Sequence, residues 1–265
     1  MELLKKIKEK SPLIHGITNP ISINTCANAT LALGARPIMA EHPKEVFEIT
    51  KTSKCLLLNL GNITDIRMKS MEISADCANL YHVPIVLDLV GVSCSALRHT
   101  FADLLLKQKN IAVIKGNYSE IYAMYSDSYQ SNGVDAEDFI NISMAATAAK
   151  AMAVKYNTTV IASGKIDIVA NNEKIIFVHN GTKTLSEITG TGCLLGMITA
   201  CCLSMDRTIN SAVYACAILG ICGELSVTEN GHGSFYTNLW DNISKINDDT
   251  IKKYIKTEEK DFEKY

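Results

Sequence analysis

The stretch Glu187-Ile188-Thr189-Gly190-Thr191-Gly192-Cys193-Leu194-Leu195-Gly196 joins a polar loop to an apolar segment that continues to Leu203. The apolar segment is long enough for about three helical turns, which predicts a loop entering the N-terminus of a buried helix. Free N–H groups and a partial positive charge make such an end suitable for an anion, and glycine lets the backbone approach a ligand closely. An ordinary glycine turn before a helix has the same pattern, and the loop alone does not separate these two interpretations.

Length and composition describe a globular chain with a sizeable core. The chain has 265 residues, of which 47% are hydrophobic and 20% are charged, and its net charge is −2. This length accommodates one large α/β domain or two small ones. Because there is no basic excess to neutralise a phosphate backbone, we expect no nucleic-acid partner. Polar residues interrupt the longest apolar stretches, so we expect no membrane partner and no membrane span.

The nine cysteines do not form the paired CxxC motifs that are typical of a zinc site. Most of them lie in apolar segments, where a reduced thiol behaves as a small hydrophobic side chain. Their odd number and the absence of a signal-peptide pattern favour the reducing cytoplasm over a disulfide framework.

Apolar runs alternate with helical patterns along the chain, which predicts one α/β domain over residues 1–265, with a mostly parallel central sheet and helices on both faces. Each run lacks a polar face, as expected of a strand buried between two helical layers. A hairpin should follow residue 165, with Ile166 to Ala170 and Lys174 to Val178 as its strands. The runs predicted as buried parallel strands are Cys55 to Leu60, Val83 to Asp88, Ile111 to Ile114 and Thr158 to Gly164.

For several other segments the sequence predicts only local structure. We interpret His15 as a hydrogen-bonded structural residue rather than a catalyst. Asp127 to Asp138 is polar and predicts a surface loop. Gly231 to Phe235 predicts a turn before a last helix from Tyr236 to Asn247, and the charged tail from Asp248 predicts a solvated or frayed end.

Four polar clusters follow apolar strands or precede helices: Asp88, Lys115 to Glu120, Ser163-Gly164 and Gly190 to Cys193. A parallel sheet would bring them to one edge, where ligands of open α/β sheets bind. Lysine, asparagine and glutamate at a strand end can contact phosphate and, through water, magnesium, although the same spacing suits a helix cap. Together the clusters predict an anion site with Mg²⁺, hence a phosphotransferase that lacks the Walker A and protein-kinase motifs.

At this point the chain resembles the hydroxyethylthiazole kinase family, ribokinase-like enzymes of thiamine salvage, over nearly its whole length. The motifs that carry the resemblance are His15-Gly16-Ile17-Thr18-Asn19, Ala27-Asn28-Ala29, Leu33-Gly34-Ala35-Arg36-Pro37-Ile38-Met39-Ala40, Val86-Leu87-Asp88 with Val90-Gly91, Lys115-Gly116-Asn117-Tyr118-Ser119-Glu120-Ile121, Thr189-Gly190-Thr191-Gly192-Cys193 and Gly231-His232-Gly233-Ser234-Phe235.

The resemblance implies transfer of the ATP γ-phosphoryl group to the hydroxyl of 4-methyl-5-(2-hydroxyethyl)thiazole, within a homotrimer whose sites lie at subunit interfaces. It implies thiazole contacts at Met39 and Gly190, ATP contacts at Lys115 and Ser163, and a catalytic base at Cys193, where most ribokinase relatives have aspartate. It also implies that Glu120 helps to organise Mg²⁺, with Asp88 a second candidate. We expect the N–H groups of Gly190, Thr191, Gly192 and Cys193 to form an anion hole for the transferring phosphoryl group.

Three positions depart from the family pattern. Lys115 replaces the usual arginine, which exchanges a planar fork for a point charge. Leu89 replaces a proline after Asp88, and Ser163 replaces a threonine while keeping the hydroxyl. These changes bear on loop geometry and ATP affinity more than on reaction type.

Other functions remain open on the sequence alone. A redox or thiol-transfer protein could use Cys193, but that cysteine has no CxxC partner. A nucleotide-binding module without catalysis would bind ATP and release no ADP. A related kinase could act on hydroxymethylpyrimidine or a sugar, and only the resemblance at Met39 and Cys193 opposes it.

Overall fold

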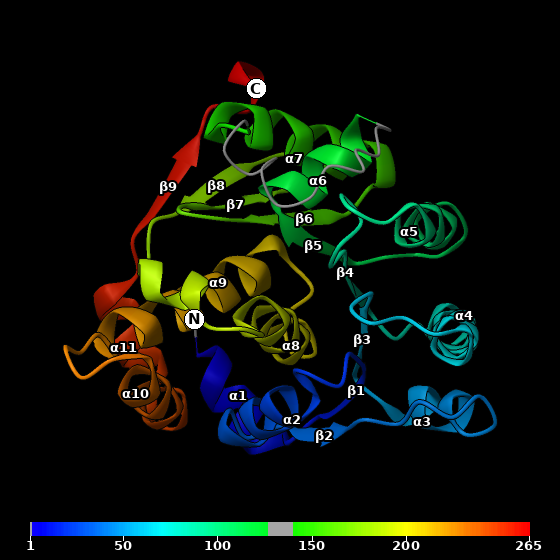
Figure 1. Ribbon diagram of the computed structural model, residues 1–265, viewed down its shortest axis with the longest axis horizontal. Helices are drawn as coiled ribbons and strands as arrows, with labels where there is room; N and C mark the ends of the chain where they lie inside the picture. Colours follow the sequence, from blue (N-terminus) through cyan, green and yellow to red (C-terminus); the bar gives the residue numbers. More distant parts are fainter. Residues whose placement is uncertain (1, 127–139) are drawn as a thin grey trace.

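The computed structural model describes residues 2–126 and 140–265, so the loop predicted from Asp127 to Asp138 lies outside the described residues. The described residues contain one sheet with the strand order β2-β1-β3-β4-β5-β6-β7-β8-β9 (Figure 1). Its strands are β1 (Leu13–Ile17), β2 (Arg36–Ile38), β3 (Cys55–Asn59), β4 (Ile85–Asp88), β5 (Val113–Asn117), β6 (Thr159–Ser163), β7 (Asp167–Ala170), β8 (Ile175–Val178) and β9 (Thr257–Lys260).

The sheet is parallel from β2 through β6 and antiparallel from β6 through β9. This confirms the mostly parallel sheet, and β7 and β8 form the hairpin expected after residue 165. The change of direction at β6 follows from chain length, because a short turn can only return the chain antiparallel to the strand it has just left.

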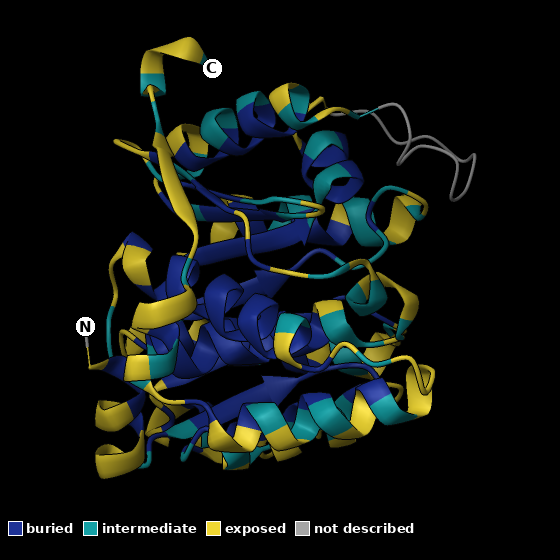
Figure 2. Ribbon diagram, turned by 90° about the vertical axis from the view of Figure 1, so that its left-hand side faces the viewer, coloured by how far each residue is buried: buried dark blue, intermediate teal, exposed yellow. Residues whose placement is uncertain are grey.

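Helices cover both faces of the sheet, as predicted. The helices α1, α2, α8, α9, α10 and α11 pack on one face, and α3 to α7 pack on the other (Figure 1). Figure 2 shows that α8 and α9 lie inside, buried on nearly all sides, whereas the outer helices keep exposed flanks. The helices are α1 (Leu3–Lys10), α2 (Ile23–Ala32), α3 (Val46–Thr52), α4 (Asp65–Leu80), α5 (Ala96–Gln108), α6 (Tyr118–Tyr125), α7 (Ile142–Tyr156), α8 (Thr191–Leu203), α9 (Ile209–Leu225), α10 (His232–Lys245) and α11 (Asp248–Tyr254).

Strand β3 illustrates why the central strands are apolar throughout. Side chains alternate between the two faces of a strand. Cys55 and Leu57 therefore belong to the core under α8, whereas Leu56 and Leu58 belong to the core under α3 to α7. Every residue of β3 is buried, so neither face can carry a polar residue until the strand ends at Asn59.

The prediction of a solvated or frayed tail from Asp248 is confirmed for exposure, because most of its residues are exposed, and wrong for fraying. The tail forms α11 and then β9, which pairs antiparallel with β8. The Asp248 carboxylate accepts hydrogen bonds from the backbone N–H groups of Leu4 (3.0 Å) and Lys5 (2.9 Å) and so caps the start of α1. A charged composition does not indicate a frayed tail, because an edge strand and an outer helix can be charged and still be held by backbone hydrogen bonds.

The last predicted turn is also shorter than expected. Gly231, with φ of 91°, is the N-cap of α10, and that helix already includes His232 to Phe235. Within residues 2–126 and 140–265, no helix has the length and apolar character needed to cross a bilayer.

Candidate active site

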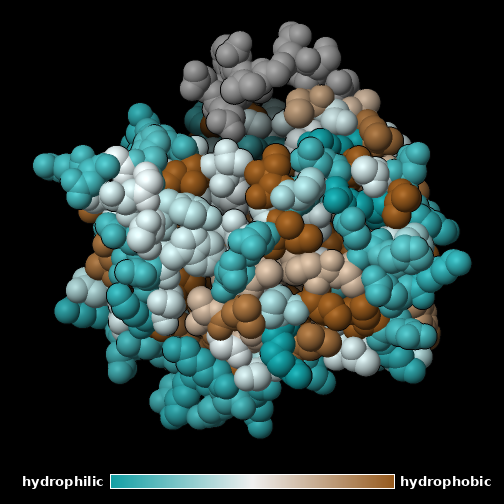
Figure 3. Space-filling model, turned by 60° about the horizontal axis from the view of Figure 1, so that its bottom comes forward, coloured by the Kyte–Doolittle hydropathy of each residue, from teal (hydrophilic) through white to brown (hydrophobic). Residues whose placement is uncertain are grey.

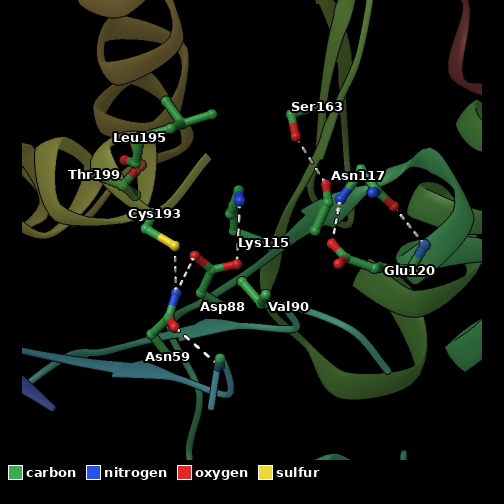
Figure 4. A network of polar contacts seen from close by, with 12 residues as sticks. Asn59, Asp88, Val90, Lys115, Asn117, Glu120, Ser163, Cys193, Leu195 and Thr199 are labelled. Carbon is green, nitrogen blue, oxygen red and sulfur yellow. Dashed lines mark hydrogen bonds and ion pairs between the residues drawn. The ribbon is translucent and has the colours of Figure 1, made fainter. Parts of the chain in front are cut away.

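Polar residues line the edge of the sheet where the parallel strands β3 to β6 end. The strand pairing places Asn59 beside Asp88, Asp88 beside Lys115, and Asn117 beside Ser163. Each of these residues ends, or nearly ends, its strand, so its side chain lies at the carboxyl edge of the sheet. The expectation that separate polar clusters meet at one sheet edge is therefore confirmed (Figure 4).

The centre of this edge is a buried ion pair. Lys115 Nζ lies 3.1 Å from Asp88 Oδ1, and the two side chains are only 3% and 0% exposed. Burial alone would lower the pKa of Lys115, but the carboxylates of Asp88 and Glu120 outweigh it and raise that pKa. Lys115 is therefore a firmly positive charge at the site.

The N-terminus of α8 lies directly over this pair. Gly190 is its N-cap, with φ of 92°, a left-handed conformation that favours glycine. A Cβ placed on Gly192 would come within 3.3 Å of Lys115 Nζ, so the ammonium group lies beside the first turn of the helix. In the described part of the chain, the N–H groups of Thr191, Gly192 and Cys193 have no protein acceptor, and Gly192 is exposed. The helix end can therefore receive an anion next to a cation.

Cys193 is buried in the same turn and is held by two carboxamides. The Nδ2 groups of Asn19 (3.2 Å) and Asn59 (3.3 Å) both donate to its Sγ, and Figure 4 shows the contact with Asn59. Asn59 Nδ2 also donates to Asp88 Oδ2 at 2.7 Å. The sulfur is thus presented as a hydrogen-bond acceptor and is linked through one side chain to the ion pair.

Sequence reasoning assigned no role to Asn19 or Asn59. Asn59 is fully buried, and its Oδ1 accepts from Gly61 N and from Asn19 Nδ2. One signal was present: Asn59 is a polar residue that ends an otherwise apolar run, as Asp88 does in the next strand. Nothing in the sequence showed that the loop carrying Asn19 returns to the same place.

Glu120 occupies a helix cap as well as the site. Its carboxylate accepts the backbone N–H groups of Asn117 and Gly91, both at 2.8 Å, and Asn117 Oδ1 accepts the N–H of Glu120 in return. Burial raises the pKa of Glu120. The described residues hold no group of three or more His, Cys, Asp or Glu side chains suited to a metal ion.

The remaining predicted site residues lie toward opposite ends of the edge. Ser163 ends β6, and its Oγ donates to Gly116 O at 3.2 Å. Met39 follows β2 at the other side of the sheet, where its Sδ and Cε approach Gly16 of β1. Lys115, Asp88 and Cys193 lie between them, so the edge offers two approaches to one centre.

Known proteins resemble this chain in sequence and in structure. The model of the hydroxyethylthiazole kinase family matches residues 4–249. "Hydroxyethylthiazole kinase 2" of Clostridium botulinum is 47% identical over 265 residues, covering 97% of this chain and 98% of that protein. A solved hydroxyethylthiazole kinase of Pyrococcus horikoshii OT3 superposes with a TM-score of 0.89 at 31% identity, covering 98% of both chains.

A more distant structure shows the fold alone. A ribokinase-like superfamily protein of Enterococcus faecalis V583 superposes with a TM-score of 0.65 at 12% identity, covering 90% of this chain and 88% of the other. The sheet, the two helical layers and these matches agree: the chain has the ribokinase-like fold and belongs to the hydroxyethylthiazole kinase family.

Proposed function

We propose that residues 1–265 act as one kinase domain that transfers the γ-phosphoryl group of ATP to the hydroxyl of 4-methyl-5-(2-hydroxyethyl)thiazole, in thiamine salvage. Family membership supports the reaction. The observation that carries it in this chain is the uncapped end of α8, with three free N–H groups beside the Lys115 ammonium. That arrangement suits a phosphoryl group in transfer.

The proposed catalysis is mainly electrostatic. Phosphoryl transfer passes through a loose transition state, so positioning and stabilisation of charge do most of the work. The N–H groups of Gly190, Thr191, Gly192 and Cys193 form the proposed anion hole, and Lys115 adds a full positive charge. Because these groups are held in place by α8 and the ion pair, they need no reorganisation as charge develops.

Cys193 is the proposed base. When the acceptor oxygen bonds to the γ-phosphorus, the bond from that phosphorus to the β–γ bridging oxygen breaks and ADP leaves. The hydroxyl proton must also leave, and the thiolate form of Cys193 at the centre of the site is its proposed acceptor. Two N–H donors, from Asn19 and Asn59, hold the sulfur in place. A structural thiol would be placed in the same way, so substitution has to separate the two roles.

The two ends of the edge suggest where the substrates bind. We place the thiazole alcohol toward Met39 and Gly190, and ATP toward Lys115 and Ser163. The Ser163 hydroxyl already donates to Gly116 O, and its oxygen can still accept a hydrogen bond.

The acidic residues fit Mg²⁺ through water rather than by direct coordination. Each carboxylate oxygen of Asp88 and Glu120 already accepts a hydrogen bond within the protein. Both carboxyl groups interact with the Lys115 ammonium, and burial raises the pKa of each. Magnesium keeps several waters in such sites, and Glu120, with Asp88 as a second candidate, would accept hydrogen bonds from them. Bound with the nucleotide, Mg²⁺ would neutralise charge on the β- and γ-phosphates.

We also propose a cytoplasmic homotrimer with sites at subunit boundaries. The free state of the nine cysteines supports a reducing compartment. Figure 3 shows hydrophobic side chains gathered on the face that lies at the bottom of Figure 1. Ile21 is 62% exposed and donates its N–H to Asn19, so one exposed apolar side chain lies beside the proposed centre.

Light scattering tests the trimer. The molar mass in solution should be three times that of one chain, and a molar mass equal to that of one chain at micromolar concentration would reject the trimer.

A coupled ADP-release assay tests the function directly. With ATP and Mg²⁺, the protein should turn over the thiazole alcohol with a kcat/KM at least about tenfold above those for hydroxymethylpyrimidine and ribose, a difference of about 1.4 kcal/mol in transition-state binding. A preference for either of the other alcohols would indicate a related kinase. ATP binding without ADP release on any of the three would indicate a nucleotide-binding module.

Substitution of Cys193 tests the proposed base. General-base help is typically worth about 10²–10⁴-fold, so Cys193→Ala should lower kcat strongly without abolishing turnover. Cys193→Asp should remain active, because a carboxylate can accept the same Asn19 and Asn59 donors. A Cys193→Asp protein that folds and binds ATP but is inactive would contradict the assignment.

Substitution of Gly190 tests the anion hole, and Gly231 provides a control for backbone strain at a helix N-cap. Both residues have φ near 91°, where valine is strained, although their ψ values differ (−5° at Gly190 and 179° at Gly231). A Cβ on Gly190 would lie 3.6 Å from Ser22 Cβ, an ordinary contact, and one on Gly231 would meet nothing within 4 Å. Gly190→Val should reduce kcat/KM on the order of 10²-fold, as expected for loss of an anion-hole contact. Gly231→Val should lower the thermal midpoint and leave kcat/KM near that of the wild type. Equal kinetics in the two variants would remove the α8 end from the mechanism.

A further inference from the structure

The segment that follows β2 is held from several directions. Ser70 Oγ donates to Glu41 O and Arg67 Nε to Glu41 Oε2, both at 2.7 Å. Both donors belong to α4, so the segment is tied to the helical layer as well as to the sheet. The backbone just after Met39 is thus fixed, although it lies in a loop.

His15 makes the hydrogen bond that lies nearest to Met39, to the carbonyl oxygen of the next residue. Its Nε2 lies 2.9 Å from Ala40 O, and its Nδ1 lies 2.9 Å from Thr50 Oγ1 of α3. A carbonyl oxygen can only accept, so Nε2 carries the proton and Nδ1 accepts from the Thr50 hydroxyl. Burial lowers the pKa of His15, which agrees with this neutral form. The expectation that His15 is hydrogen-bonded is confirmed.

Gly16, the residue after His15, faces Met39 from the opposite face of β1. A Cβ on Gly16 would lie 3.1 Å from Met39 Cε and 2.7 Å from Met197 Cε. The two thioether ends therefore meet over Gly16, where any Cβ would have to displace them. Met197 lies one helical turn after Cys193 on α8, so both side chains lie on the same side of that helix.

We propose that His15 is a positioning residue for the acceptor alcohol: by holding the Ala40 carbonyl it keeps the Met39 thioether over Gly16, one helical turn from Cys193. His15 and Gly16 are adjacent in β1 and act on Met39 from opposite faces of the strand. His15 holds the backbone that follows Met39 by a hydrogen bond, and Gly16, which lacks a side chain, leaves room for the Met39 thioether. The proposal rests on the proposed function, because it takes Met39 as an acceptor contact. A thioether at a fixed place suits a small, polarisable heteroaromatic ring.

Three substitutions separate this role from a general structural one. His15→Phe keeps a ring and loses both hydrogen bonds. It should raise KM for the acceptor about tenfold, the size expected for one hydrogen bond, and leave KM for ATP within about twofold. His15→Gln returns an N–H donor to the place of Nε2 and should recover most of the loss. Thr50→Val removes only the Nδ1 partner and should give an intermediate acceptor KM.

His99 offers a matched control, because its Nε2 also meets a backbone carbonyl, Ala123 O at 3.4 Å. His99→Phe should leave the acceptor KM unchanged. Gly16→Ala gives an independent measurement: its methyl group must displace the flexible ends of Met39 and Met197, so the acceptor KM should change while the ATP KM does not. If His15→Phe does not fold, as judged by thermal unfolding, Thr50→Val and Gly16→Ala still provide the test.

The kinetics are measured on the alcohol that the wild-type protein phosphorylates best. Failure of the wild type on the thiazole alcohol would reject the proposed function, whereas the ratio between variant and wild type reports on His15. The positioning role is overturned if the acceptor and ATP KM values rise together in His15→Phe, if His15→Phe and His15→Gln behave alike, or if the acceptor KM does not move.

Discussion

The site depends on the buried ion pair between Lys115 and Asp88. Two charges this deeply buried are tolerated only when each has its partner and further hydrogen bonds, and Asn59 supplies one to Asp88. The pair joins the ends of β4 and β5 and lies under the first turn of α8. It thereby brings a fixed positive charge to the helix end, where backbone N–H groups are already free.

On the two sides of this pair, the sheet edge differs in polarity. Toward β2 and β1 the surroundings are apolar, with Met39 and Met197 over Gly16. Toward β5 and β6 they are polar, with the Asn117 cap and Ser163. The order of the parallel strands produces this gradient, because each strand contributes its own terminal residues to the next position along the edge. This difference is the basis of the proposal that a heteroaromatic alcohol and a nucleotide approach from opposite sides.

Much of the fold could be predicted because a strand that is buried on both faces is apolar along its whole length, and such runs can be found in the sequence. The apolar runs from Cys55 to Leu60 and from Val83 to Asp88 had to be central strands, and short loops determined the hairpin of β7 and β8. The tail from Asp248 could not be predicted in this way. Its place depends on two partners far away in sequence: the edge of β8, with which β9 pairs, and the N–H groups of Leu4 and Lys5, which Asp248 caps.

The sequence by itself determined the helix end at Gly190 to Cys193 and the polar residues that finish β4, β5 and β6, because glycine, apolar periodicity and strand ends are local features. Tertiary structure alone decided which of these groups touch. It paired Lys115 with Asp88, turned Glu120 toward Gly91, and brought Asn19 and Asn59 to the Cys193 sulfur. Such contacts join residues up to 174 positions apart, and only the packing of α8 against the strand ends sets their distances.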